Sequence, residues 1–290
     1  MKKKTSFSTK GHRADMGDLT IYRLLANRYT DAVGPLVFLD HIITKVHSSP
    51  LNGGTGGHPH RGIATLSYII EGEDEHFDSA GNFAKVYSGG IQWMKAGNGI
   101  IHDETLNVDS RTGGNHTHAF QIWINLPFKN KTEKPEYLAI QSNEVPHKEL
   151  SSDGGWIKVI VGNFEDLNSN ITDYSKQFLY HIQLKPGKNF TISIDDKVKV
   201  AAFIPSKNAI LNDVEFQAGE FIEFDRTVGE IVIENKLQEN TNIILFGGEP
   251  YTEPIVAEGP FMMNSSAEIA EAYRDFYAWK YGMINYQKEN

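Results

Sequence analysis

The chain is a series of short runs rich in β-branched and aromatic residues, each closed by a turn signal. Clear runs in the first half span residues 20–25, 64–70 and 119–126, with glycine turns such as 71–72 and 80–81 between them. A spacing of roughly ten residues between turns is typical of β-sandwiches and β-barrels. The pattern therefore predicts an all-β fold.

The second half repeats this pattern, with apolar runs at 178–184, 198–204 and 242–246. Between the halves, residues 127–152 are rich in Lys, Glu, Pro, Ser and Asn and show little apolar periodicity. Linkers of this composition commonly separate domains. We therefore expect two domains, 1–145 and 146–290.

A single helix is predicted near the C-terminus. Ser265 and Glu268 fit a capping box at its start, and Gly282 is expected to close its end. Apolar residues at three- and four-residue spacing then form a stripe along one face of the helix toward Lys280: Ile269, Ala272, Tyr273 and Phe276. Such a helix on a β protein is expected to cover a sheet face or edge.

Composition narrows the function classes. The 290 residues include no cysteine, which excludes disulfides, thiolate metal ligands and cysteine nucleophiles. A formal net charge of −9 argues against direct nucleic-acid binding. Lys2 to Lys4 are followed by polar residues rather than an apolar segment, so we expect no export signal. No apolar run is long enough for a membrane span, and a cytoplasmic location is expected.

Two pairs of metal-binding residue types occur about forty positions apart. Segment 52–60 ends in His58-Pro59-His60 after several glycines, and segment 97–104 ends in His102-Asp103-Glu104. Alternate residues of a strand share a face, so each pair can point into a barrel interior. Three imidazoles and one carboxylate suit Fe(II), Mn, Co, Ni, Cu or Zn. We therefore predict that His58, His60, His102 and Glu104 bind one divalent transition metal.

Other histidines are assigned structural roles. A second HxH pair, His116 and His118, has no HxE partner and is expected to be structural or at the surface. His76 follows the acidic residues 71–75, which are expected to form a solvated rim, and we expect it to hydrogen-bond within a turn. His41 is expected to be a hydrogen-bonded structural residue rather than a fifth ligand.

The role of one residue beside the ligand pairs is left open by the sequence. Arg61 follows His60 directly and could serve either a structural or a site role. Trp93 and Met94 are adjacent on a predicted strand, so only one of them can face the barrel interior. Aromatic and Met residues at strand spacing are expected to be core.

The ordered motifs resemble the pirin family of the cupin superfamily. They run through Gly57-His58-Pro59-His60-Arg61-Gly62, His76-Phe77-Asp78-Ser79-Ala80-Gly81, Gly89-Gly90-Ile91-Gln92-Trp93-Met94, Gly99-Ile100-Ile101-His102-Asp103-Glu104 and Gly259-Pro260-Phe261-Met262-Met263-Asn264. Many family members have Ser in place of Asp103 and Arg in place of Asn98. Neither position is a predicted ligand, so these departures concern the pocket mouth and the substrate.

The resemblance implies two tandem cupin barrels, with one metal in the N-terminal barrel. The family's ligand set falls on His58, His60, His102 and Glu104, and the family usually carries iron, so Fe(II) is the first choice of metal. After His147, His181 is the only histidine, and we expect the C-terminal barrel to be free of metal.

Two functions follow from the resemblance. The first is a quercetinase-type dioxygenase that binds a flavonol or another enolic or phenolic small molecule at an open metal position, with Glu104 as ligand or general base. The alternative is an iron-binding, redox-sensitive regulator that binds a transcription factor or a metabolic enzyme. Fold and ligand set are common to both and cannot decide between them.

Overall fold

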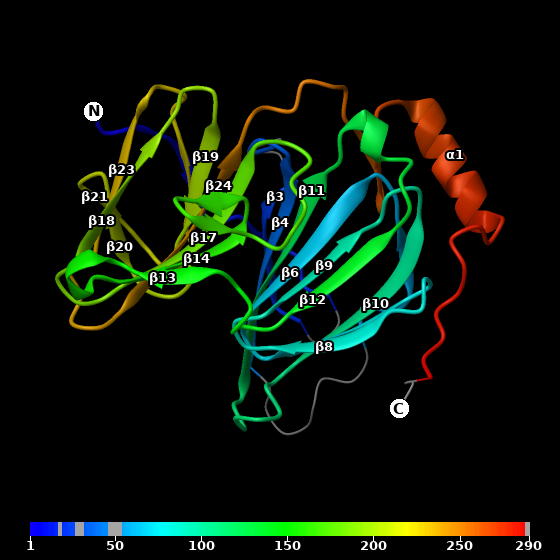
Figure 1. Ribbon diagram of the computed structural model, residues 1–290, viewed down its shortest axis with the longest axis horizontal. Coiled ribbons are helices and arrows are strands. Elements are labelled where there is room, and N and C mark those ends of the chain that lie inside the picture. The colour runs from blue at the N-terminus through cyan, green and yellow to red at the C-terminus, as the bar shows by residue number, and fades with distance from the viewer. Residues whose placement is uncertain (17–18, 27–31, 46–53, 288–290) are drawn as a thin grey trace. The chain divides into compact units, whose positions relative to one another are not determined.

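The computed structural model describes the chain except for residues 17–18, 27–31, 46–53 and 288–290 (Figure 1). Residues 52 and 53, which begin the glycine-rich segment before His58, therefore lie outside the described part. Strands dominate the described chain and the one α-helix assigned in it lies near the C-terminus, which confirms the predicted all-β class. Within the described chain no helix is long and apolar enough to cross a membrane.

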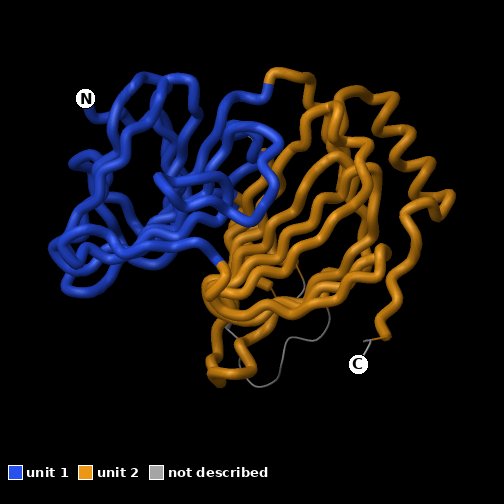
Figure 2. The backbone as a smooth tube through the Cα atoms, in the orientation of Figure 1, with its two compact units in different colours: residues 1–12, 24–36, 145–251 blue, residues 13–23, 37–144, 252–290 orange. Residues whose placement is uncertain are grey.

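The chain forms two compact units, coloured separately in Figure 2. Unit 1 contains residues 1–12, 24–36 and 145–251, and unit 2 contains 13–23, 37–144 and 252–290. The main division falls at 144/145, but each unit also includes a segment from the other end of the chain. The contiguous domains 1–145 and 146–290 remain a proposal about sequence organisation.

Unit 1 is built from a large sheet, a smaller sheet and a short hairpin. The large sheet has the order β1 (Thr5–Thr9), β22 (Phe221–Phe224), β19 (Lys199–Phe203), β24 (Thr241–Gly248), β17 (Gln177–Leu184), β14 (Gly155–Val161) and β13 (His147–Glu149). The smaller sheet has the order β18 (Asn189–Ile194), β23 (Gly229–Glu234), β20 (Ala209–Leu211) and β21 (Val214–Phe216), and the hairpin is β15 (Asn163–Phe164) with β16 (Leu167–Asn168). A short 3-10 helix, Ser151–Asp153, precedes β14.

A continuous apolar core fills unit 1. Every second residue of β17, Tyr180, Ile182 and Leu184, is buried in it. The alternation follows from the two-residue period of a strand, which puts these side chains on one face. Aliphatic side chains from the other strands complete this core, among them Ile157, Val200, Ile222, Ile231 and Leu245.

Unit 2 carries the predicted ligands. Its large sheet has the order β12 (Glu136–Ile140), β9 (Ile91–Lys95), β6 (Ile63–Glu71), β11 (His116–Asn125), β4 (Leu36–Lys45), β3 (Ile21–Leu25) and β2 (His12–Arg13). A second sheet has the order β5 (His58–His60), β10 (Ile100–Asn107), β7 (Glu73–Asp78) and β8 (Phe83–Tyr87), and β25 (Val256–Glu258) pairs with β26 (Phe261–Met263). A 3-10 helix, Phe128–Asn130, follows β11.

Many polar side chains are buried in unit 2. Ser67, Asp74, His76, Gln92, His102 and Glu104 are each at most 7% exposed. Burial of a polar group costs free energy unless the group finds a partner. A group of buried polar residues therefore indicates a functional interior rather than a purely structural one.

The helix α1 (Ser266–Tyr277) confirms the predicted cap. Ser265 is the N-cap residue, and its hydroxyl accepts a hydrogen bond from the backbone N–H of Glu268. The predicted closure at Gly282 is wrong, because the helix already ends at Tyr277. Trp279 takes the left-handed conformation there, and the N–H of Lys280 donates to the carbonyl of Asp275, the bond of a Schellman motif.

Helix α1 lies along one edge of unit 2, at the right of Figure 1. Its buried residues Ile269 and Ala272 pack with Phe261 and Met263 of β26. Arg61, one residue after β5, donates to the carboxylates of Glu271 at 3.0 Å and Asp275 at 2.9 Å. Arg61 therefore has a structural role that fastens the helix to the strand carrying His58 and His60.

Replacing Arg61 by Met should lower the free energy of unfolding by about 1–3 kcal/mol. The change leaves the mostly buried Asp275 with Lys280 alone, and loss of one partner of a buried pair is costly. Urea unfolding followed by circular dichroism measures the effect. The matched control is Arg274→Met, on an exposed position of the same helix, which should leave the midpoint unchanged. Equal midpoints for the Arg61 variant and the natural chain would contradict the assigned role.

Candidate metal centre

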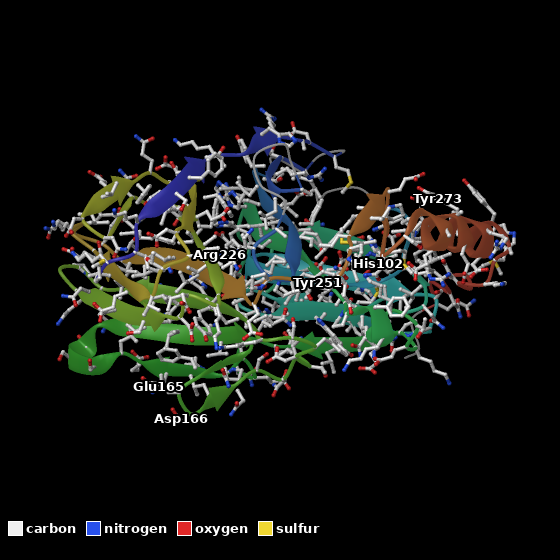
Figure 3. All side chains as sticks on the ribbon, turned by 90° about the horizontal axis from the view of Figure 1, so that it is seen from above. His102, Glu165, Asp166, Arg226, Tyr251 and Tyr273 are labelled. Carbon is white, nitrogen blue, oxygen red and sulfur yellow. The ribbon has the colours of Figure 1, made fainter. Side chains whose placement is uncertain are left out.

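Strand β5 brings the first ligand pair against the second. In the antiparallel pairing of β5 with β10, His58 lies opposite His102 and His60 lies opposite Ile100. The ring centroids of the three histidines are 4.4 Å apart for His58 and His102, 4.9 Å for His58 and His60, and 5.0 Å for His60 and His102. The structure therefore gathers the three predicted imidazoles into one group. Figure 3 shows the labelled His102 among the strands of unit 2.

In two of the three rings, Nδ1 lies within hydrogen-bonding distance of a backbone carbonyl. His58 Nδ1 lies 2.8 Å from the carbonyl oxygen of Gly56, and His60 Nδ1 lies 3.1 Å from that of Pro260. An Nδ1–H that donates to a carbonyl leaves the Nε2 lone pair free, which is the usual arrangement of a metal-binding histidine. His58 Nε2 and His102 Nε2 then face each other at 3.0 Å.

Burial keeps two of these imidazoles neutral. Desolvation, with a smaller effect from His58, lowers the pKa of His60 to about 3. Desolvation also lowers the pKa of His102 well below its ordinary value, and the neighbouring histidines act in the same direction. Neutral imidazole is the form that binds metal ions, so these rings are ready to bind without losing a proton.

Glu104 lies next to His102 on the same face of β10 and is held by two neutral donors. Its Oε1 accepts from the Ser67 hydroxyl at 2.9 Å, and its Oε2 accepts from Gln121 Nε2 at 2.7 Å. Ser67 and Gln121 are directly opposite each other in the pairing of β6 with β11. Two strands of the large sheet therefore fix the carboxylate of Glu104.

The described donors fall into two overlapping groups that share His102. One group is His58, His60 and His102; the other is His76, His102 and Glu104, and the donor atoms within each group lie within 4.8 Å of one another. Both groups are in unit 2. Imidazole and carboxylate donors suit a borderline divalent transition metal, and the buried Nδ1 of His102 has no hydrogen-bond partner among the described residues. The residues present therefore fit the metal that the motifs imply.

A cavity of about 380 Å³ is bordered by three of these donor residues. His58, His60 and Glu104 line it together with Ser67 and Gln121. Apolar side chains form much of the remaining wall: Phe38, Ile42, Ile69, Leu106, Phe120 and Trp123. A mostly apolar cavity of this size with a small number of polar groups is typical of small-molecule sites.

The stacked rings of Phe38 and Trp123 form one wall of the cavity. Phe38 stacks on Trp123 with centroids 4.3 Å apart, and Trp123 meets the His60 ring edge-on at 4.9 Å. Arg23 lies over Phe38 and forms a two-bond ion pair with Asp40. The charge of Arg23 is thus balanced by a residue of the cavity wall.

The environments of His41, His116 and His118 agree with the roles predicted for them from the sequence. His116 is exposed, and His118 is buried with its Nε2 at 2.8 Å from Nε2 of His41, which agrees with a structural role for both. Trp93 and Met94 are both buried core residues. Neither belongs to the cavity wall.

The interpretation of the acidic turn near residue 75 is wrong. Glu73 and Asp74 are buried on β7 instead of forming a solvated rim, and Glu73 accepts hydrogen bonds from Lys85 and Ser110. His76 is buried on the same strand, where it pairs with Asp78. Charge density alone misled the prediction: Lys85 of β8 and Ser110 compensate the carboxylate of Glu73, whereas the buried Oδ2 of Asp74 has no hydrogen-bond partner among the described residues.

Sequence reasoning missed Phe38, Ser67, Gln121 and Trp123. Each belongs to an apolar run of the large sheet, and local sequence gives no sign that these residues meet β10. The two-residue alternation along β11 does place Gln121 and Trp123 on one face. For these two residues, this alternation is the signal that the sequence offers.

Comparison with known proteins agrees with this architecture. The family model for Pirin matches residues 19–124, and the model for the Pirin C-terminal cupin domain matches residues 179–282. The fold is therefore that of a protein with two cupin domains.

Curated relatives identify the family. Human Pirin is 31% identical over 79% of this chain and 78% of its own length. A Pseudomonas aeruginosa protein named "Putative quercetin 2,3-dioxygenase PA3240" is 30% identical over 92% of this chain and 93% of its own. The chain belongs to the pirin family.

A solved structure extends the match to the whole fold. The crystal structure of quercetin 2,3-dioxygenase from Acinetobacter baumannii has a TM-score of 0.87 and 28% identity, and covers 98% of this chain and 100% of that one. The nickel(II) complex of the Escherichia coli pirin YhhW has a TM-score of 0.64 at 22% identity, covering 83% and 96%, and supports the fold alone.

The buried pair His41 and His118 should make the free energy of unfolding decrease as the pH falls. Desolvation lowers the pKa of His41 to about 3 and that of His118 to about 4, both below the ordinary 6.5. The unfolded chain therefore takes up these protons first, and stability present above pH 6.5 is lost as the pH falls. Each histidine should contribute about 2 kcal/mol of this loss between pH 7 and pH 5.

Urea unfolding of the metal-free protein across this pH range measures the effect. The double variant His41→Gln/His118→Gln should have a shallower dependence on pH, and the exposed His116→Gln should follow the natural chain. Parallel curves for the double variant and the natural chain would show that the two rings are not held neutral.

Proposed function

We propose that this chain is a metal-dependent oxygenase of flavonol-like or other enolic and phenolic small molecules, with the metal held by His58, His60, His102 and Glu104. The observation that carries the proposal is the largely apolar cavity whose wall includes His58, His60 and Glu104. A planar aromatic molecule can bury its rings against Phe38 and Trp123 while its oxygens reach the polar end. The names of two relatives, a quercetin 2,3-dioxygenase structure and a curated homologue, support the same substrate class.

A bound divalent metal would supply Lewis acidity that favours an ionised substrate hydroxyl. The chain's own residues would then bind, orient and deprotonate the substrate. Gln121 and Ser67 hold Glu104 toward the cavity, so its carboxylate can accept the hydroxyl proton as a general base. The apolar wall excludes water from the reacting end, which strengthens the electrostatic interactions there.

A regulatory iron protein is the alternative that shares this ligand set. That function predicts a centre closed off by protein side chains, with its effect transmitted to a surface. The cavity leading to His58, His60 and Glu104 instead leaves room for a small molecule. We therefore prefer the enzyme.

The direct test is oxygen uptake with quercetin after anaerobic reloading of the metal-free protein with Fe(II), Mn, Co, Ni or Cu. We expect turnover with at least one metal. Glu104→Gln should abolish turnover, and retention of metal in that variant identifies the carboxylate as the base. Glu75→Gln, on the neighbouring strand β7, is the matched control and should remain active. No turnover with any metal or flavonol would contradict the proposal.

Trp123→Ala should raise KM for a flavonol about tenfold, equivalent to about 1.4 kcal/mol of binding free energy. The change removes the ring that stacks on Phe38 but none of the donors. Steady-state oxygen uptake gives KM, and metal content should stay at the natural level. The exposed Trp279→Ala is the control. A KM unchanged by Trp123→Ala would place the substrate elsewhere.

A further inference from the structure

His76 is a buried histidine that the four-ligand set does not use. It lies on β7 with a fully buried side chain, directly opposite Glu104 in the antiparallel pairing of β7 with β10. Asp78 is opposite His102 in the same pairing. Because alternate residues of a strand share a face, His76 and Asp78 point to the same side of the sheet as His102 and Glu104.

One nitrogen of His76 is committed to Asp78. Nε2 of His76 lies 3.2 Å from Oδ2 of Asp78. Asp78 is itself held firmly, since its Oδ1 accepts from the backbone N–H groups of Ala80 and Asn82 and its Oδ2 accepts from Asn82 Nδ2 at 2.8 Å. A carboxylate fixed by three donors makes Nε2 the protonated nitrogen of His76.

The other nitrogen then carries a lone pair and faces the centre. Nδ1 of His76 is buried and has no hydrogen-bond partner among the described residues. It lies 4.0 Å from Glu104 Oε1, too far for a hydrogen bond, and His76 forms the second donor group together with His102 and Glu104. A merely structural buried histidine would be expected to satisfy both nitrogens, so the unpartnered Nδ1 calls for a ligand.

The ring of His76 is also held in orientation. It stacks on Tyr137 with centroids 4.3 Å apart and an angle of 10° between the planes. The hydroxyl of Tyr137 donates to Gln92 Oε1, which fixes the stacking partner in turn. The stack holds the plane of the imidazole, and the bond to Asp78 opposes a ring flip that would turn Nδ1 away from His102 and Glu104.

We propose that His76 is a fifth protein donor of the metal centre, presented by Asp78 in a carboxylate–histidine–metal arrangement. The inference rests on the proposed function in that it needs a metal at His102 and Glu104. It adds an imidazole that favours a borderline divalent ion over Mg²⁺ or Ca²⁺. It also leaves one fewer coordination position for substrate and dioxygen than four ligands would.

Metal affinity and the absorption spectrum of the Co(II) protein test the proposal without relying on activity. The metal-free full chain is titrated with Co(II) in competition with a chromophoric chelator. His76→Phe, which keeps a ring to stack on Tyr137, should weaken Co(II) binding about 10- to 100-fold and shift the visible ligand-field bands. Asp78→Asn should weaken binding by less, because Nδ1 is then oriented poorly but still present.

Two further variants separate the possible failures. His116→Phe changes an exposed histidine and should leave affinity and spectrum unchanged, while His60→Phe removes a ligand of the proposed centre. If the natural chain binds Co(II), His60→Phe abolishes binding and His76→Phe changes neither affinity nor spectrum, the fifth donor is refuted while the centre stands. If the natural chain binds no Co(II), both proposals fall. Should His76→Phe not fold, as judged by circular dichroism, His76→Gln takes its place with the same criteria.

Discussion

Strand β10 pairs with β5 on one side and β7 on the other, and the register of these two pairings determines the site. His102 faces His58 across one pairing and Asp78 across the other, while Glu104 faces His76. Because side chains alternate between the faces of a strand, a slip of one residue would turn the ligands of one strand to the opposite face. All chemistry considered for unit 2 depends on this register.

Burying these polar side chains in unit 2 costs free energy, and hydrogen bonds from the surrounding residues offset part of that cost. Except for His102, each donor is oriented by a hydrogen bond with a neighbouring group: a backbone carbonyl for His58 and His60, Ser67 and Gln121 for Glu104, and Asp78 for His76. The carbonyl of Pro260 comes from the C-terminal segment, which Arg61 also fastens through α1. A donor set held this rigidly needs little rearrangement when it binds an ion or a substrate.

The sequence predicted what depends on short-range periodicity. Spacing of two residues put His58 with His60 and His102 with Glu104, and the Ser265–Glu268 cap located the start of the helix. Long-range pairing could not be derived in this way. Nothing near His76 shows that β7 will lie beside β10, and nothing near Phe38 or Trp123 shows that they will stack beside His60. The end of α1 was misplaced because Trp279 adopts the left-handed conformation that the sequence suggests for Gly282.

The contrast between the two units follows from the same physics. Unit 1 has a core of mainly aliphatic side chains, whereas the cavity of unit 2, although lined largely by apolar side chains, borders a set of buried polar groups. Such groups are retained where a ligand completes their bonding, since without one they weaken the fold. The central claim is therefore that an ion completes the bonding of the histidines in unit 2. Anomalous diffraction from crystals grown with Co(II) tests it most directly. The account predicts one strong peak within bonding distance of His58, His60, His102 and Glu104; a peak elsewhere in the chain, or none at full cobalt loading, would contradict it.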